Sequence, residues 1–349
     1  MTARILPRVA AAACTALLVC RPPEAAIEAP PSPRWFDVAP NSVVWSAGRA
    51  GDSLPSDIGA IAADDSLVYI LDRWHGDVLA LDARSGRRRW RWRPSTGNDA
   101  RPDAAAPASG LSTSAPGVLV ARPDGRALIE LDRRGRAMRT IVLDRREFLF
   151  GICALPDRRA LVATARSAAA WLLVGGGAPP RAVPPPWPDS MARPAVGWQG
   201  APAPLPGDAG CAIALSVGAG FAVIAPHGAA RAAPYVEPVA PARFVDRPVH
   251  QGARNGVARK LDGATIAATG AAVHGDTLFV AFGGTSADRG RLVDRYLWRS
   301  GRYAGSWRLA SAGARIAITR ERLYVLGDAD GQPTIAAYRR RMLARVPRP

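Results

Sequence analysis

The chain has 349 residues, of which 48% are hydrophobic, and it contains 34 glycines and 32 prolines. So many Gly and Pro residues suit tight turns and argue against a mainly helical protein. The formal net charge of +17 would fit a nucleic-acid partner. However, Lys260 is the only lysine, the arginines are spread along the chain, and no stacking-aromatic RNA motif is present, so we expect no nucleic-acid partner.

Residues 1–28 are predicted to be an export signal. Two arginines precede an apolar run from Val9 to Val19, which is too short to span a bilayer and is followed by a proline pair. Two processing routes stay open: ordinary cleavage near Ala25-Ala26, or lipid attachment at Cys20, although Val19 stands where such signals usually have a small residue. We therefore expect an exported protein, periplasmic or on the cell surface, that reaches the membrane only through such an anchor.

The clearest repeat runs from Ile58 to Arg93. It divides into four short apolar runs separated by Asp, Ser and Gly turns, namely Ile58 to Ala63, Leu67 to Leu71, Val78 to Asp82 and Arg87 to Arg93. Each run has the length of a β-strand, so the unit is predicted to be a four-stranded antiparallel sheet.

Similar units follow along the rest of the chain, which predicts an all-β fold: a six-bladed β-propeller of four-stranded antiparallel blades over residues 34–346. The expected blades lie near 58–93, 110–144, 148–186, 195–239, 264–310 and 311–346. Continuously apolar runs such as Leu67 to Leu71 are typical of sheets that are buried on both faces. Ser42 to Trp45 has no partner in its own repeat, so we expect it to complete the last blade as an outer strand; Met342 to Val346 is the alternative.

These repeats resemble those of two propeller families. The stretch from Gly48 to Asp82, with an apolar strand ending in Asp72-Arg73, resembles the NHL-type repeat of bacterial six-bladed propellers. In the same unit, Ala80, Asp82, Ser85, Gly86 and Trp90 resemble the quinoprotein-type repeat, which implies that Trp90 docks against the adjoining blade. Propellers serve as scaffolds, binding modules and enzymes, so either resemblance constrains function only weakly.

Cys153 and Cys211 remain after the signal is removed, and each falls in a predicted strand of neighbouring repeats. In an oxidising compartment two such cysteines can pair. The alternative is that both are small buried apolar residues.

The sequence offers no recognisable catalytic or metal set. Calcium-dependent lactonase propellers use Asn among their inner-strand ligands, but all three asparagines of this chain fall in predicted loops. The four histidines show no close metal-ligand spacing, and a nucleophile elbow and a phosphate-cradling glycine motif are both missing. We therefore predict no metal, no cofactor and no catalytic residue.

Ligand candidates are chosen by position. Asp72, Arg73, Trp74 and His75 follow a buried strand and are expected at the mouth of the central channel. Arg87, Arg89, Arg91 and Arg93 share one face of a predicted outer strand, where they form either a solvated edge or a surface for anions. The long insertions Pro94 to Ser109 and Ala240 to Gly263 are expected to be loops that shape a rim.

Two functions follow from this reading. The first is a monomeric, non-enzymatic binding or scaffold module for a protein, peptide or glycan. The alternative is a hydrolase or lyase that acts on a small extracellular substrate in the central channel. Convergence of at least three carboxylate or imidazole groups in that channel would favour the enzyme.

Overall fold

The computed structural model describes residues 34–48, 54–94, 110–143, 149–164, 170–184, 186, 200–239, 243–251, 254–263, 265–284, 288–313 and 315–340. The predicted signal, with Cys20, lies outside these residues. So do Met342 to Val346 and most of the insertion from Pro94 to Ser109.

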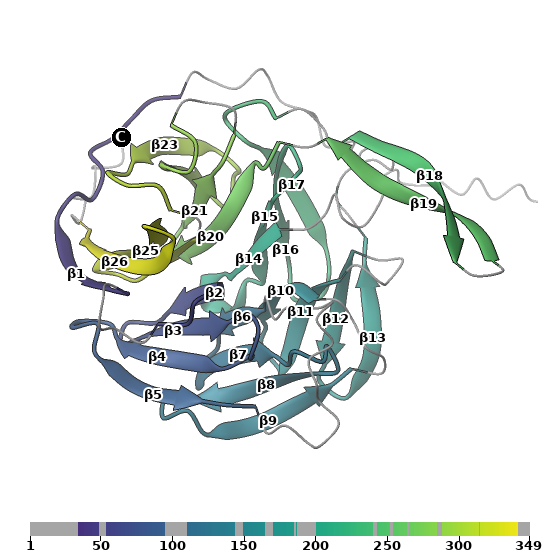
Figure 1. The fold of residues 1–349 in the computed structure, drawn as a ribbon, viewed down its shortest axis with the longest axis horizontal. Coiled ribbons are helices and arrows are strands. Elements are labelled where there is room, and N and C mark those ends of the chain that lie inside the picture. The colour runs from purple at the N-terminus through teal and green to yellow at the C-terminus, as the bar shows by residue number, and fades with distance from the viewer. Residues whose placement is uncertain are drawn as a thin grey trace, which may run out of the picture. The chain divides into compact units, whose positions relative to one another are not determined.

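Six four-stranded antiparallel sheets, here called blades 1 to 6, are arranged around a common centre (Figure 1). Blade 1 contains β2 (Ile58–Ala63), β3 (Leu67–Asp72), β4 (Val78–Asp82) and β5 (Arg88–Trp92), and blade 2 contains β6 (Leu111–Thr113), β7 (Gly117–Ala121), β8 (Ala127–Asp132) and β9 (Ala137–Val142). Blade 3 contains β10 (Leu149–Ala154), β11 (Arg159–Thr164), β12 (Trp171–Gly175) and β13 (Ala178–Val183), and blade 4 contains β14 (Gly200–Pro204), β15 (Cys211–Leu215), β16 (Gly220–Ile224) and β17 (Ala230–Pro234). Blade 5 contains β20 (Ala268–His274), β21 (Thr277–Phe282), β22 (Leu292–Leu297) and β23 (Tyr303–Arg308), and blade 6 contains β24 (Arg315–Ile318), β25 (Arg322–Ala329), β26 (Gln332–Arg339) and β1 (Val43–Ala47).

The first strand of each blade lies nearest the centre, where β2, β6, β10, β14, β20 and β24 contact their neighbours around the ring. The predicted fold, an all-β propeller of six four-stranded blades, is confirmed. Among the described residues no helix is long and apolar enough to cross a membrane. A short 3-10 turn, η2 (Pro206–Asp208), precedes β15.

The N-terminal strand closes the ring. β1 pairs antiparallel with β26, so that Trp45 lies opposite Ala337 and Ala47 opposite Ile335. This confirms the expectation that the unpaired run at Ser42 to Trp45 supplies the outer strand of the last blade.

The hydrophobic core consists of six clusters, each formed between two neighbouring blades. In β3, which is buried along its whole length, Val68 and Ile70 join the cluster shared with blade 6. The residues that alternate with them, Leu67, Tyr69 and Leu71, join the cluster shared with blade 2. Successive strand residues point to opposite faces. Each blade therefore buries both faces only because a neighbour stands on each side.

A short N-terminal segment, residues 34–37, extends blade 5 on its outer side. Phe36 forms a parallel bridge with Ser306 of β23. The Asp37 N–H donates to the Ser306 carbonyl at 2.9 Å, and the Ser306 N–H donates to the Trp35 carbonyl at 3.0 Å. The chain thus crosses the outside of blade 5 before it enters blade 6 as β1.

The insertion from Ala240 to Gly263 is not the loop that the sequence predicted. It forms a two-stranded sheet from β18 (Arg243–Gln251) and β19 (Arg254–Gly263). Pro248 lies opposite Val257 in this pair. Proline is tolerated there because both strands of a two-stranded sheet are edge strands, so a proline in the run did not argue against a strand.

Candidate binding site in the central channel

Two adjoining cavities run along the centre of the ring. The wider one has a volume of about 860 Å³ and is lined by residues from all six blades. The narrower one has a volume of about 350 Å³. Five apolar residues line both cavities and so lie where the two cavities adjoin: Ile61, Leu111, Pro202, Ala271 and Ile316.

The wide end lies where the inner strands turn back into the second strands. Most of its wall is apolar, and polar groups stand around its rim. The polar residues that line the cavity are Asp64, Ser112, Thr113, Ser114, Glu130, Arg139, Asp157, Arg158, Asp208 and His274. Asp157 and Arg158 both adopt positive φ values, 57° and 59°, which are uncommon for residues other than glycine.

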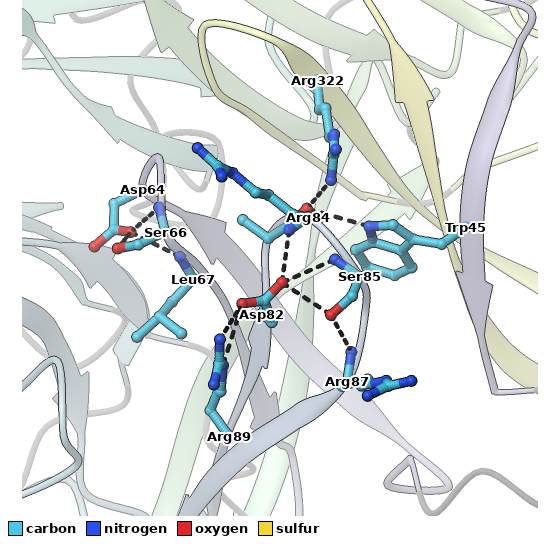
Figure 2. A network of polar contacts seen from close by, with 11 residues as sticks. Trp45, Asp64, Ser66, Leu67, Asp82, Arg84, Ser85, Arg87, Arg89 and Arg322 are labelled. Atoms are coloured by element: carbon cyan, nitrogen blue, oxygen red, sulfur yellow. Dashed lines mark hydrogen bonds and ion pairs between the residues drawn. The ribbon is translucent and has the colours of Figure 1, made fainter.

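The carboxylate of Asp64 already has hydrogen-bond partners within its own turn. Its Oδ1 accepts hydrogen bonds from the backbone N–H groups of Ser66 and Leu67, each at 2.8 Å (Figure 2). Burial raises the pKa of Asp64, but these bonds, with those from the Ser66 hydroxyl and Arg133, lower it below its usual value overall. The carboxylate therefore stabilises the β2–β3 turn, and we do not count it among the ligand-binding groups.

His274 is the imidazole at the wide end, and burial lowers its pKa, with Arg340 and Arg320 adding to the effect. In the described part of the chain, no three His, Cys, Asp or Glu side chains come close enough together to hold a metal ion. Ser114 also lines the wide end, and its hydroxyl oxygen is buried without a hydrogen-bond partner. Among the described residues, the wide end therefore offers polar groups around an apolar wall.

Arg315 is the charged residue at the narrow end. It is the first residue of β24, lines the narrower cavity, and lies against Gly270 of blade 5. Burial lowers the pKa of the Arg315 guanidinium; the nearby charge of Arg73 also lowers it, and that of Asp57 raises it. Sequence reasoning missed Arg315, because a single arginine at the start of an apolar run resembles an ordinary strand end.

The predicted ligand group at Asp72 to His75 lies in the turn between β3 and β4. Asp72 accepts the backbone N–H groups of Trp74 and His75, each at 3.0 Å, and its Oδ2 lies 2.9 Å from His75 Nδ1. The side chains of Trp74 and His75 are exposed, and neither lines the channel cavities. None of the four residues lines either of the two cavities.

The arginines predicted to face an anion have carboxylate neighbours in their own blade. Arg89 binds Asp82 at 2.6 Å, as Figure 2 shows, and Arg91 binds Asp77 at 2.5 Å. Arg93 lies 3.3 Å from the same Asp77 carboxylate. The side chain of Arg87 is exposed, and its backbone N–H donates to Ser85 Oγ. Three of these four arginines therefore pair with two carboxylates of blade 1, Asp82 and Asp77.

The blades are joined at their outer rims by side-chain N–H groups that reach into the next blade. Trp90 Nε1 donates to the Arg133 carbonyl at 2.8 Å, in the turn between β8 and β9. Trp45 Nε1 donates to the Ala83 carbonyl at 3.1 Å, in the equivalent turn of blade 1, and Figure 2 shows the indole beside that turn. Glycine is required beneath each ring, because a Cβ at Gly135 would lie 2.9 Å from Trp90 and one at Gly86 would lie 2.7 Å from Trp45.

In blades 3 and 4 an arginine of the outer strand, rather than a tryptophan, donates to the next blade. Arg181 donates to the His227 carbonyl and Arg231 donates to the Trp298 carbonyl, again in the turn between the third and fourth strands of the next blade. The sequence pointed to Trp90 alone, since Arg and Trp share no recognisable motif at this position.

Blades 3 and 4 are also joined covalently in the structure. The Sγ atoms of Cys153 in β10 and Cys211 in β15 lie 2.13 Å apart, and both residues are buried. The bond links two cysteines that are 58 residues apart in sequence.

The fold and this channel define the chain as a six-bladed β-propeller. No family model and no curated protein matches the sequence. Among solved structures, the chain is similar to the WD40 domain of Neurospora crassa Pan2, with 11% identity and a TM-score of 0.51 over 89% of this chain and 99% of that one.

Two further solved propellers are similar. The β-propeller domain of Myceliophteria thermophila Cps50 (Swd1) has 12% identity and a TM-score of 0.50, over 86% of this chain and 100% of that one. Virginiamycin B lyase from Staphylococcus aureus has 11% identity and a TM-score of 0.50, over 85% of this chain and 99% of that one. At such identities the likeness concerns the fold alone, which does not determine function.

Proposed function

We propose that this protein is an exported, monomeric, non-enzymatic binding module whose ligand enters the central channel. The observation that carries the proposal is the pair of adjoining cavities on the axis of the ring, each with a mostly apolar wall drawn from all six blades, with Ser114 among the polar residues of the larger cavity and Arg315 in the smaller one. A cavity of this size with a mostly apolar lining and a few polar groups is typical of a ligand site. A protein segment, a peptide, a glycan or a smaller molecule could occupy it.

Export is supported by the apolar N-terminal run and by the Cys153–Cys211 bond, because disulfides persist in oxidising compartments. Intact-mass measurement of the membrane and soluble fractions separates the two processing routes. A lipid-modified Cys20 at the new N-terminus indicates an anchor, whereas a chain that begins near Ala26 indicates ordinary cleavage. A mature chain that still carries residues 1–28 contradicts export.

For the repeat class, two proposals stand side by side. The docking of Trp45 and Trp90 onto turn glycines of the next blade supports the quinoprotein-type resemblance for the outer strands of blades 6 and 1. The NHL-type assignment is supported by the sequence pattern that ends in Asp72-Arg73.

A channel-blocking variant tests the binding site. Peptides, glycans and small acids are screened for thermal stabilisation of the purified protein, and each hit is retested on Ala271→Trp, which places a large side chain where both cavities meet. Val142→Trp on the exposed face of β9 is the matched control. We expect Ala271→Trp to lose at least tenfold in affinity and Val142→Trp to bind normally.

Equal binding by both variants would show that ligands do not use the channel. Turnover of a bound hit, lost in Ala271→Trp, would instead favour the hydrolase or lyase hypothesis.

A further inference from the structure

We propose that the β18–β19 hairpin, here called the arm, binds the surface of an anionic lipid bilayer through the face that carries four of its five cationic residues. The arm contributes no residue to the two central cavities, so this surface would serve the protein whatever ligand those cavities bind. It would also bring the protein to a membrane without an attached lipid at Cys20.

The arm is a sheet of its own. Neither of its strands pairs with a strand of the six blades, and β18 and β19 pack chiefly against each other. Figure 1 shows the two strands beside the ring rather than within it. An isolated two-stranded hairpin is only marginally stable in water. A partner surface that covers the arm would therefore stabilise it.

The strand register places the cations on one face of the arm. Along β18 the odd-numbered residues from Arg243 to Gln251 share a face, and each residue of β19 shares the face of the residue directly opposite. Lys260 lies opposite Val245, and Arg254 lies opposite Gln251. One face therefore carries four cationic residues, which are Arg243, Arg247, Arg254 and Lys260.

None of these four residues lies opposite a carboxylate in the register. Asp246 is on the other face, opposite Arg259, and Asp262 lies at the bulge beside Arg243, where it opposes no residue of β18. The four cations extend over about 26 Å of strand, at roughly 3.3 Å for each residue. Charges on either face would keep the two edge strands soluble, so their gathering on one face favours an extended, negatively charged partner.

The other face of the arm favours a bilayer over a soluble acidic polymer. Two of its four rows pair apolar residues with each other, Phe244 with Leu261 and Pro248 with Val257. At a lipid interface such residues leave water, while cations are attracted to anionic headgroups. An acidic polymer would use the cations alone. The arm combines the two features by which interfacial segments bind anionic membranes.

Liposome flotation of the whole purified protein tests the proposal with vesicles of phosphatidylglycerol and phosphatidylcholine, and with vesicles of phosphatidylcholine alone. We expect at least tenfold stronger binding to the anionic vesicles, because each cation near such a surface contributes roughly a factor of five. Arg247→Gln/Lys260→Gln should weaken this binding at least tenfold. The matched control Arg84→Gln/Arg134→Gln, at exposed turns of blades 1 and 2, should leave it unchanged.

Two further variants separate charge, apolar contact and folding of the arm. Arg247→Lys/Lys260→Arg keeps both charges and should bind the anionic vesicles like wild type. Phe244→Ser/Leu261→Ser should weaken that binding at least threefold, because it removes an apolar pair. Circular dichroism and melting temperature verify that the blades of every variant fold.

Equal binding to both kinds of vesicle would overturn the proposal, because an attached lipid or an uncleaved signal would bind either surface. Unchanged binding by Arg247→Gln/Lys260→Gln would also overturn it, and so would loss of binding in the charge-conserving variant. Binding to polyphosphate without binding to anionic vesicles would replace the bilayer by an acidic polymer. Ala271→Trp should bind the anionic vesicles normally, so failure of the arm and failure of the channel function are distinguished.

Discussion

Two junctions between neighbouring blades are built on opposite principles. Between blades 1 and 2, the half-buried Trp90 indole donates one neutral hydrogen bond to the Arg133 carbonyl. Between blades 4 and 5, Arg34 from the N-terminal segment binds both oxygens of Asp294, at 3.2 and 2.9 Å, and Glu237 at 2.5 Å. The Asp294 side chain is fully buried. Loss of the Trp90 indole is therefore expected to remove only one neutral hydrogen bond. Loss of Arg34 is expected to leave the buried Asp294 carboxylate without a counter-charge.

The largest effect is therefore expected at Arg34. Replacement by Ala should destabilise the protein by about 3–5 kcal/mol, because it leaves the buried Asp294 carboxylate unpaired. Urea unfolding at pH 7 measures the loss. The double variant Arg34→Met/Asp294→Leu is the control, and it should recover most of the stability because neither charge remains. A double variant as unstable as Arg34→Ala would show that packing, rather than charge, holds this junction.

The same variant has a pH dependence with a definite sign. Burial raises the pKa of Asp294 even with Arg34 beside it. A raised folded-state pKa means that the folded form holds its proton more tightly, so acid favours folding through this group. The stability deficit of Arg34→Ala should shrink as the pH falls from 7 through that raised pKa. A deficit that stays constant or grows on acidification would contradict the assignment.

The junction of blades 3 and 4 is held by the disulfide between Cys153 and Cys211. Cys153→Ala/Cys211→Ala should lose about 2–4 kcal/mol, since a bond that closes a 58-residue separation restricts the unfolded chain. Thermal unfolding with and without reductant measures this effect. Intact mass before and after alkylation of the native, unreduced protein supplies the control. Two free thiols in that protein would contradict the bond.

At the neutral junction, Trp90→Phe removes the N–H donor and keeps most of the ring. We expect a loss of about 1 kcal/mol, the usual net contribution of one hydrogen bond. Trp74→Phe, at an exposed residue in the β3–β4 turn, is the matched control and should be neutral within about 0.5 kcal/mol. A loss as large as that of Arg34→Ala would erase the difference between the two junctions.

The smallest effect is expected at Asp82, whose carboxylate binds the turn beneath Trp45 and the exposed Arg89 (Figure 2). Burial raises the pKa of Asp82, but hydrogen bonds from Arg89, Ser85 and Arg84 lower it to about 2. Asp82→Asn should cost about 0.5 kcal/mol at pH 7, because surface ion pairs contribute little.

A lowered carboxyl pKa stabilises the fold above the unfolded-state value, and this contribution is lost as the pH falls through the folded-state value. The difference between wild type and Asp82→Asn should therefore disappear between about pH 4 and the folded-state pKa of about 2. Acid titration of both proteins by circular dichroism measures it. A difference that persists at the lowest pH would contradict the role of the charge.

The strands and blades could be predicted from the repeated sequence pattern. Contacts between residues that lie far apart in sequence could not. Leu67 to Leu71 could be recognised as a strand buried on both faces, and Ser42 to Trp45 as the missing outer strand, since both follow from local pattern. The β18–β19 hairpin was not predicted from the sequence, and Pro248 is tolerated in it because both strands are edge strands. Arg315 lines a cavity only because the inner strands of all six blades meet at the centre, and no local pattern encodes that meeting.

Ring closure is the claim on which every junction and the channel depend, and amide hydrogen exchange of β1 tests it most directly. The account predicts that the β1 amides that face β26 are protected from exchange, because the two strands are paired in blade 6, whereas the outward-facing amides of this edge strand exchange quickly. Rapid exchange of the β26-facing amides of β1 while β26 stays protected would show that the N-terminal strand does not close the ring.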